Sequence, residues 1–142
     1  MYLHKYMIEA IEGYRCDKCK DSTSEKHRRQ FISYAPDIIT IQLKRTDEYG
    51  RKLNTTVTIN PFLDLTKYRD AGSQETLRYE LSTVIKHQGS SGFGHYICSA
   101  KGPNGDWYGF DDQRKTVTSF TAAVSSTGDF TPYLLFFQRK ED

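Results

Sequence analysis

The chain lacks the marks of several large protein classes. Its 142 residues contain no apolar run of about 18, the length that a membrane-spanning helix needs, so we expect no membrane association. The first residues, Met1-Tyr2-Leu3-His4-Lys5, have no apolar core of a secretory signal peptide. The net charge is only +2 and no basic run is present, which argues against nucleic acid as a partner.

Cysteine is also scarce. The chain has three, an odd number that does not make a disulfide framework in a domain of this size. Together with the missing signal peptide, this predicts an intracellular protein of the cytoplasm, the nucleus or both. Charged residues make up 27% and apolar residues 37%, as in soluble globular proteins. The length allows one domain with a real core and is short for two.

Two of the cysteines, Cys16 and Cys19, form a Cys-x-x-Cys motif. This spacing places two thiolates for one tetrahedral zinc ion, which wants four ligands. No second such pair exists in the chain; His27 is a candidate third ligand, and Cys98 is distant in sequence. A redox role would need the motif at the start of a helix that follows a strand, which the sequence does not indicate. We therefore predict a half-site that stays free of zinc unless a second cysteine pair is supplied.

Most of the remaining chain has the patterns of β-strands. Alternating or continuous apolar and β-branched residues predict strands over residues 38–44, 52–59, 79–87, 94–100, 107–112 and 131–139. The last of these is apolar on both faces and is predicted to be central in its sheet. Residues 2–12 have apolar side chains at helical spacing before Gly13 and predict a short amphipathic helix. The expected fold class is α+β, with a mostly antiparallel sheet.

A hairpin around a dense turn signal brings the candidate catalytic residues together. The two strands are Gly94–Ala100 and Trp107–Asp112, and Lys101–Asp106 is the turn. If Ala100 lies opposite Asp106, antiparallel counting places His95 opposite Asp111, with both side chains on one face. A slip by one residue brings Asp112 to His95 instead.

A carboxylate on one imidazole nitrogen fixes the tautomer and leaves the other nitrogen free as a general base. The alternative is that His95 and its aspartate neighbours are ordinary surface or structural residues, which most such residues on strands are. Spacing alone does not decide between these two interpretations.

The motifs of the chain resemble those of the ubiquitin-specific proteases, a family of cysteine deubiquitinases. The Gly-His-Tyr of the first strand and the Trp-Tyr-x-Phe-Asp-Asp of the second resemble the histidine box of this family. Residues 36–45, Pro-Asp-Ile-Ile-Thr-Ile-Gln-Leu-Lys-Arg, and residues 79–87, Tyr-Glu-Leu-Ser-Thr-Val-Ile-Lys-His, resemble two further signatures. The chain departs from the family at Thr46 and Asn60, where aromatic residues are usual. The resemblance runs from about residue 3 to residue 139.

The resemblance implies a papain-like cysteine protease fold of which this chain is the rear part. On this interpretation residues 1–142 are a single partial domain: residues 1–30 are a remnant of the fingers with half a zinc knuckle, and residues 31–142 are the palm. The thumb, with the segment Gly-Asn-Thr-Cys-Tyr that carries the nucleophile, is absent from the sequence. The missing thumb half, or another protein, is expected to cover the exposed face.

The resemblance also implies roles for individual residues. His95 would deprotonate the cysteine of the missing half, Asp111 would orient His95, and Asp112 would be a second carboxylate. Gly92, Gly94 and Tyr96 would line the channel for the C-terminal tail of ubiquitin, which ends in Gly-Gly.

The implied partner is ubiquitin or a ubiquitinated protein, and catalysis would need no cofactor. Without a cysteine box, the chain alone is predicted to be inactive. Two alternatives stay open: a catalytically dead module that binds ubiquitin or another partner, and a scaffold unrelated to ubiquitin.

Overall fold

The chain forms two compact units in a computed structural model that describes residues 8–20, 26–90 and 92–140. The first unit combines the described residues up to Ala35 with Leu65–Leu77, and the second combines Pro36–Asp64 with the described residues from Arg78 onward. No helix in the described ranges is long and apolar enough to cross a membrane.

The first unit contains a small antiparallel pair of strands. Strand β1 (Ile8–Ile11) pairs with β2 (Lys26–Arg29), with Ile8 opposite Arg29. The helix predicted over residues 2–12 is therefore wrong at Ile8–Ile11, and residues 2–7 lie outside the described part. The periodicity of a short apolar run does not distinguish helix from strand, and here backbone pairing with β2 decides the conformation.

The rest of the first unit contains two buried leucines whose amides are hydrogen-bonded. The amide of Leu65 donates to the carbonyl of Leu77 over 2.8 Å, and the amide of Leu77 donates to the hydroxyl of Thr66 over 2.9 Å. Thr66 begins the short 3-10 helix η1 (Thr66–Tyr68). A parallel bridge joins Ile32 to Arg69 in the same unit.

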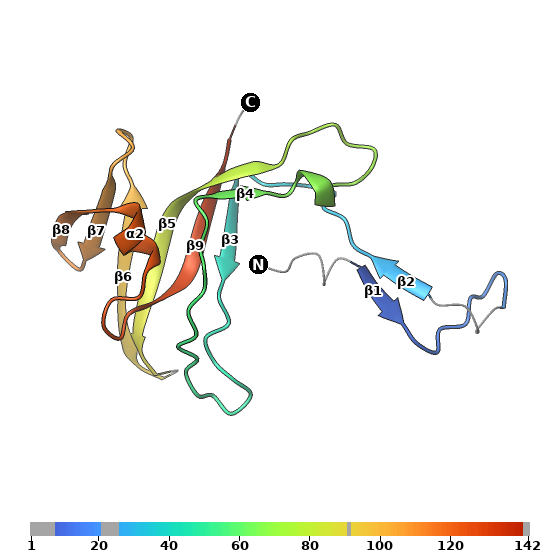
Figure 1. The fold of residues 1–142 in the computed structure, drawn as a ribbon, viewed down its shortest axis with the longest axis horizontal. Helices are drawn as coiled ribbons and strands as arrows, with labels where there is room; N and C mark the ends of the chain where they lie inside the picture. The colour runs from blue at the N-terminus through green and yellow to red at the C-terminus, as the bar shows by residue number, and fades with distance from the viewer. Residues whose placement is uncertain (1–7, 21–25, 91, 141–142) are drawn as a thin grey trace. The chain divides into compact units, whose positions relative to one another are not determined.

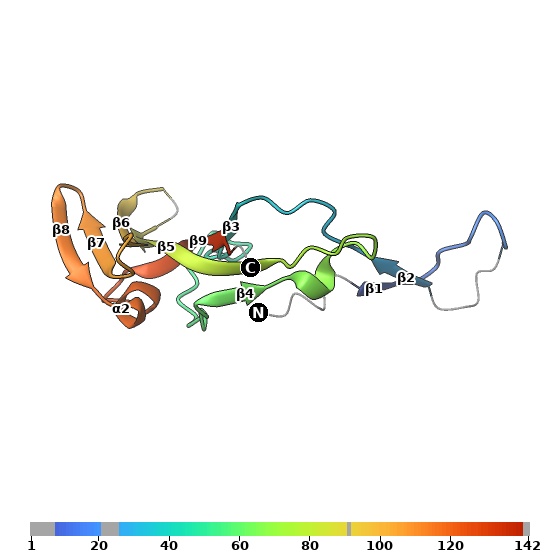
Figure 2. The ribbon, with the colours of Figure 1, turned by 90° about the horizontal axis from the view of Figure 1, so that it is seen from above.

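The second unit is built on one antiparallel sheet. Its strands follow the order β3-β9-β5-β6-β7-β8, and β4 pairs with β5 outside this path (Figure 1). Figure 2 shows the same succession from above. The strands and the short helix α2 span Ile38–Gln42 (β3), Phe62–Asp64 (β4), Arg78–Gly89 (β5), Gly94–Lys101 (β6), Trp107–Asp111 (β7), Arg114–Thr118 (β8), Phe120–Val124 (α2) and Thr131–Arg139 (β9).

The position of the last strand confirms the prediction from its apolar pattern. Strand β9 lies between β3 and β5 and is hydrogen-bonded on both edges. The predominance of antiparallel strands over helix also agrees with the expected fold class. The core follows from this arrangement, because its most buried side chains come mainly from β5 and β9: Tyr79, Leu81, Val84, Leu135 and Phe137.

The helix α2 joins β8 to β9 and covers part of β7. Its first residue, Phe120, meets the buried Trp107 of β7 edge to face, with 6.0 Å between ring centroids. The Ser119 hydroxyl accepts the amide of Ala122 and caps the helix. This packing fixes where the chain turns back toward β9.

The buried face of β5 gives a stability prediction. Leu81 is 1% exposed and lies opposite Phe137 of β9, so Leu81→Ala should lower the free energy of unfolding by about 2–5 kcal/mol. Val117→Ala on β8, where the side chain is 78% exposed, is the control and should change it by about 0.5 kcal/mol or less. Urea unfolding measures both. Equal losses for the two variants would contradict this assignment of the core.

Candidate active site

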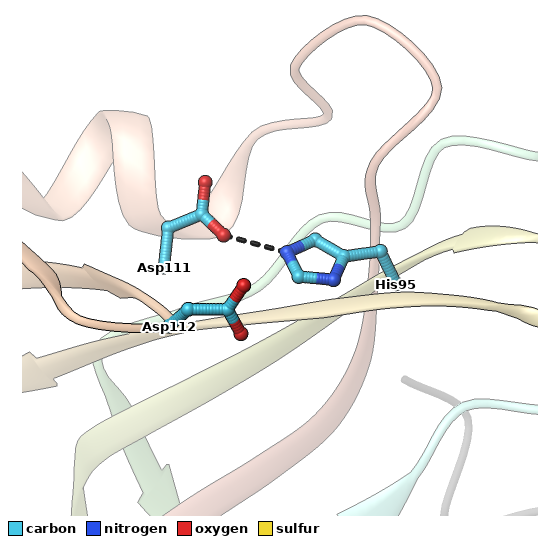
Figure 3. A group of neighbouring side chains, drawn as sticks. All are labelled: His95, Asp111 and Asp112. Atoms are coloured by element: carbon cyan, nitrogen blue, oxygen red, sulfur yellow. Dashed lines mark hydrogen bonds and ion pairs between the residues drawn. The ribbon is translucent and has the colours of Figure 1, made fainter.

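The structure brings His95 and Asp111 into direct contact. His95 is the second residue of β6 and Asp111 is the last residue of β7, and His95 Nε2 lies 2.6 Å from Asp111 Oδ1 (Figure 3). Both side chains are about half exposed, at 44% and 54%. The pair therefore lies at the open end of the β6–β7 hairpin, as the sequence predicts, and is open to solvent.

The predicted register of this hairpin was wrong by two residues. Ala100 lies opposite Tyr108, and Lys101 opposite Trp107, so the loop comprises residues 102–106. The amide of Gly102 donates to the carbonyl of Asp106 over 2.7 Å and closes this loop. A shift of two residues keeps every side chain on its face, so His95 and Asp111 still share one face and meet diagonally.

Asp112 supplies a second carboxylate beside the ring. It lies in the tight turn after β7, in which Asp111 pairs with Arg114, and it has a φ of 49°. Aspartate tolerates this left-handed conformation better than most residues. One side-chain nitrogen or oxygen of each of His95, Asp111 and Asp112 lies within 4.8 Å of the others. Figure 3 shows the Asp112 carboxylate pointing toward the ring.

These carboxylates favour the protonated form of the imidazole. The hydrogen bond from Asp111 raises the pKa of His95 above the ordinary histidine value, and the charges of Asp111 and Asp112 act in the same direction. Partial burial opposes this rise without cancelling it. With Nε2 engaged by Asp111, the remaining ring nitrogen, Nδ1, is the one available for proton transfer.

A second histidine, His87, has the opposite environment. Burial and the nearby charge of Lys52 lower the pKa of His87. Its ring packs 4.5 Å from that of Tyr96 and 6.1 Å from that of Tyr133. His87 is therefore a packed residue of β5, distinct from the exposed His95.

The residues predicted to line a channel lie in and after the β5–β6 loop. Gly94 has no room for a side chain, because a Cβ there would lie 2.1 Å from the Gln88 carbonyl and 2.3 Å from His87 Nε2. A Cβ on Gly92 would meet nothing within 4 Å. Tyr96 is 54% exposed and packs on His87, on the face of β6 opposite that of His95. The structure thus places Gly94 and Tyr96 against His87, and it directs the Tyr96 side chain to the face of β6 away from His95.

The one cysteine of the second unit is unsuited to act as a nucleophile with His95. Cys98 lies three residues after His95 on β6, so strand alternation directs it to the other face. Burial raises the pKa of the Cys98 thiol, which disfavours the reactive thiolate.

The other two cysteines form a turn suited to a metal. In the first unit, the amide of Lys20 donates to the Cys16 carbonyl over 2.7 Å, and Lys20 has a φ of 57°. The backbone amides of Cys19 and Lys18 lower the pKa of the Cys16 thiol, and the Cys19 side chain adds to this effect. This donor set fits half of a zinc site, and the described residues place no third ligand with Cys16 and Cys19.

One neighbour of His95 was not foreseen from the sequence. The ring of Phe130, just before β9, meets the ring of His95 at 72° with centroids 6.0 Å apart. Phe130 belongs to no motif, and 35 positions in the chain separate it from His95. No periodicity or spacing in the sequence signals this contact.

An antiparallel sheet with a solvent-exposed His–Asp pair at the end of a hairpin defines a candidate acid–base site. The chain belongs to the ubiquitin carboxyl-terminal hydrolase family, because the model of that family matches residues 4–137.

Curated relatives agree with this assignment. Ubiquitin carboxyl-terminal hydrolase 19 of Arabidopsis thaliana is 35% identical over 140 residues, which are 95% of this chain and 20% of that protein. Ubiquitin carboxyl-terminal hydrolase 17-like protein B of Mus musculus is 30% identical over 132 residues, 92% of this chain and 27% of that protein. The chain therefore spans between 20% and 27% of the length of these two relatives.

Solved structures support the fold. The Ubp8/Sgf11/Sus1/Sgf73 DUB module of SAGA bound to ubiquitin aldehyde contains a chain that matches 94% of this one with a TM-score of 0.74. The match covers 31% of that chain at 23% identity. A further structure of the same module matches 96% of this chain with a TM-score of 0.70 at 23% identity.

The two histidines of the second unit should titrate differently. By pH titration in NMR spectra, His95 should have a pKa above about 6.5 and His87 a pKa below it. Asp111→Asn should lower the His95 pKa more than Asp112→Asn does, because the Asp111 hydrogen bond is the largest cause. His87 is the internal control. A His95 pKa that neither variant lowers would contradict the described pair.

The sign of this shift also gives a pH dependence of stability. A raised pKa means that the folded chain binds the His95 proton more tightly than the unfolded chain does. The resulting stabilisation is present below about pH 6.5 and disappears as the pH rises through the folded-state pKa. In urea unfolding at a series of pH values, Asp111→Asn should weaken this dependence and leave the smaller part that the Asp112 charge contributes.

The thiols should differ in reactivity. Near neutral pH, iodoacetamide should modify Cys16 before Cys98, because the Cys16 pKa is lowered and the Cys98 pKa is raised. Peptide mass mapping over time measures the order. The urea-unfolded chain is the control and should lose the difference, whereas faster modification of Cys98 in the folded chain would contradict the prediction.

Proposed function

We propose that this chain is the part of a cysteine-type deubiquitinase that supplies the catalytic imidazole and its orienting carboxylate. The reaction is hydrolysis of the bond that follows the C-terminal glycine of ubiquitin. The 2.6 Å contact between His95 Nε2 and Asp111 Oδ1 carries the proposal, together with membership of the ubiquitin carboxyl-terminal hydrolase family. The similar Ubp8-containing module, which was solved bound to ubiquitin aldehyde, also supports it.

In the proposed mechanism, His95 moves one proton. Its Nδ1 takes the proton of a cysteine thiol, and the thiolate attacks the carbonyl carbon of the last ubiquitin glycine. The protonated ring then gives its proton to the departing amine, and water releases ubiquitin from the thioester. Asp111 holds the ring through Nε2 and stabilises the imidazolium, and the Asp112 charge adds to this stabilisation.

The thiol must come from outside this sequence. Cys98 lies on the other face of β6 with a raised pKa, and Cys16 and Cys19 form the metal-type turn of the first unit. We therefore propose that residues 1–142 alone do not cleave ubiquitin conjugates. A segment with a cysteine box completes the site.

The remaining roles concern binding. Gly92, Gly94 and Tyr96 are the proposed lining for the ubiquitin tail, supported by the exposure of Tyr96 and of the intervening Phe93, which is 79% exposed. Further large apolar side chains of the second unit are exposed, including Phe62 at 65% and Val117 at 78%, which favours a covering partner. Cys16 and Cys19 would hold zinc together with a second cysteine pair.

A ubiquitin vinyl-sulfone probe tests the proposal on the longest natural transcript product that contains residues 1–142. The product should be labelled, and His95→Ala should slow labelling by about 100-fold or more because the general base is lost. Asp111→Asn should slow it nearly as much, and Asp112→Asn by less than about tenfold.

Asp106→Asn is the matched control, since it removes a carboxylate in the loop at the other end of the same hairpin. It should leave the rate unchanged. Normal labelling of His95→Ala would contradict the assigned base. Ubiquitin binding by the unmodified product without any labelling would favour a binding module instead of an enzyme.

A further inference from the structure

The turn between α2 and β9 lies against the candidate base. Thr127 and Phe130 form an isolated antiparallel bridge, with amide-to-carbonyl bonds of 3.0 and 3.1 Å in the two directions. Gly128, inside this turn, has a φ of 57°, which suits glycine. The turn ends at Phe130, whose ring meets the His95 ring edge to face. A centroid separation of 6.0 Å is within the range in which aromatic rings attract each other.

Two lysines from other parts of the second unit form hydrogen bonds to this turn. Lys86 Nζ donates to the Ala122 carbonyl of α2 over 2.6 Å and to the Thr127 hydroxyl over 3.4 Å. Lys52 Nζ donates to the Asp129 carbonyl over 3.3 Å and to the His87 carbonyl of β5 over 3.2 Å. The two side chains therefore connect Thr127 and Asp129 of the turn to β5.

Lys86 is unusual because it is a buried lysine. It is 3% exposed, and its hydrogen-bond acceptors are an uncharged carbonyl and an uncharged hydroxyl. Burial lowers the pKa of Lys86, as expected for an ammonium group removed from water. Burying the Lys86 ammonium group therefore costs desolvation energy. Its hydrogen bonds to Ala122 and Thr127 offset part of this cost and also position the turn.

The imidazole needs a second contact in order to be fixed. The terminal torsion of histidine is broad, and one hydrogen bond at Nε2 allows the half-exposed ring to swing about that bond. The ring of Phe130 supplies a second contact on the imidazole. Two charged groups act on the ring, Asp111 and Asp112. The residue opposite His95 on β5, Gln88, is neutral and adds no charge.

We propose that Phe130 is a positioning residue for His95, held in place by Lys86 and Lys52 through the Thr127–Phe130 turn. The proposal rests on the proposed function, in which His95 is the base. Phe130 itself exchanges no proton. It keeps the ring in the orientation that bonds Asp111 and directs Nδ1 outward.

The His95 pKa distinguishes positioning from simple covering of the ring. If Phe130 only covers the ring, its removal increases hydration of the imidazolium and the pKa rises. If Phe130 keeps the ring on Asp111, its removal weakens the hydrogen bond that raises the pKa, and the pKa falls. The two roles therefore predict shifts of opposite sign.

The first experiment measures this shift by NMR titration of the full chain. Phe130→Leu should lower the His95 pKa by roughly half a unit, and Lys52→Met and Lys86→Met should lower it in the same direction by less. Phe62→Leu, at an exposed phenylalanine of β4, is the matched control and should leave it unchanged. Lys52→Met removes one fastening of an exposed turn and keeps the test informative if Phe130→Leu does not fold. An unchanged or raised pKa would overturn the proposal.

The second experiment uses probe labelling of the longest natural transcript product. Phe130→Leu should slow labelling by about tenfold, because a base that is misplaced by a fraction of an ångström transfers protons poorly. Phe130→Tyr, which keeps an aromatic ring at this position, should be labelled faster than Phe130→Leu. If His95→Ala blocks labelling but Phe130→Leu leaves its rate unchanged, the positioning role is overturned. If Phe130→Leu lowers the His95 pKa but His95→Ala is labelled at the normal rate, Phe130 does orient the ring and the proposed function is refuted.

Discussion

The hydrogen bond between His95 Nε2 and Asp111 Oδ1 depends on the face to which each side chain of the β6–β7 hairpin points. The two residues lie beyond the last backbone pair of the ladder, Cys98 with Phe110, where the strands separate toward solvent. A register shift of one residue would turn Asp111 to the face away from His95. The observed register differs from the predicted one by two residues, so both side chains stay on the same face. The chemistry of the site thus follows from the two-residue period of the strands.

The rest of the second unit holds this hairpin end in place. Strand β5 pairs with both β6 and β9, and its buried side chains form much of the core. The same strand contributes Lys86, which bonds to α2 and to the turn before β9. One strand thereby connects the core, the hairpin of His95 and the aromatic ring that packs on it. The site is open to solvent on the outside and is supported by contacts with the sheet.

The sequence allowed prediction of the features that rest on local patterns. The hairpin, the central position of residues 131–139 and the proximity of His95 to a carboxylate follow from alternation and turn chemistry. The conformation of Ile8–Ile11 did not, because pairing with Lys26–Arg29 is a non-local interaction. The contacts of Phe130 and Lys86 are also non-local and depend on how α2 directs the chain into β9. No spacing rule reaches across such distances in the sequence.

The most direct measurement of the central interaction is the tautomer of neutral His95, obtained from two-bond proton–nitrogen correlation spectra of the imidazole above its pKa. A carboxylate accepting from Nε2 requires the hydrogen on Nε2 and leaves Nδ1 bare. We expect neutral His95 to be almost entirely in the Nε2-protonated form, and Asp111→Asn to reduce this preference. A predominantly Nδ1-protonated ring, or a preference that Asp111→Asn does not change, would contradict the assigned hydrogen bond.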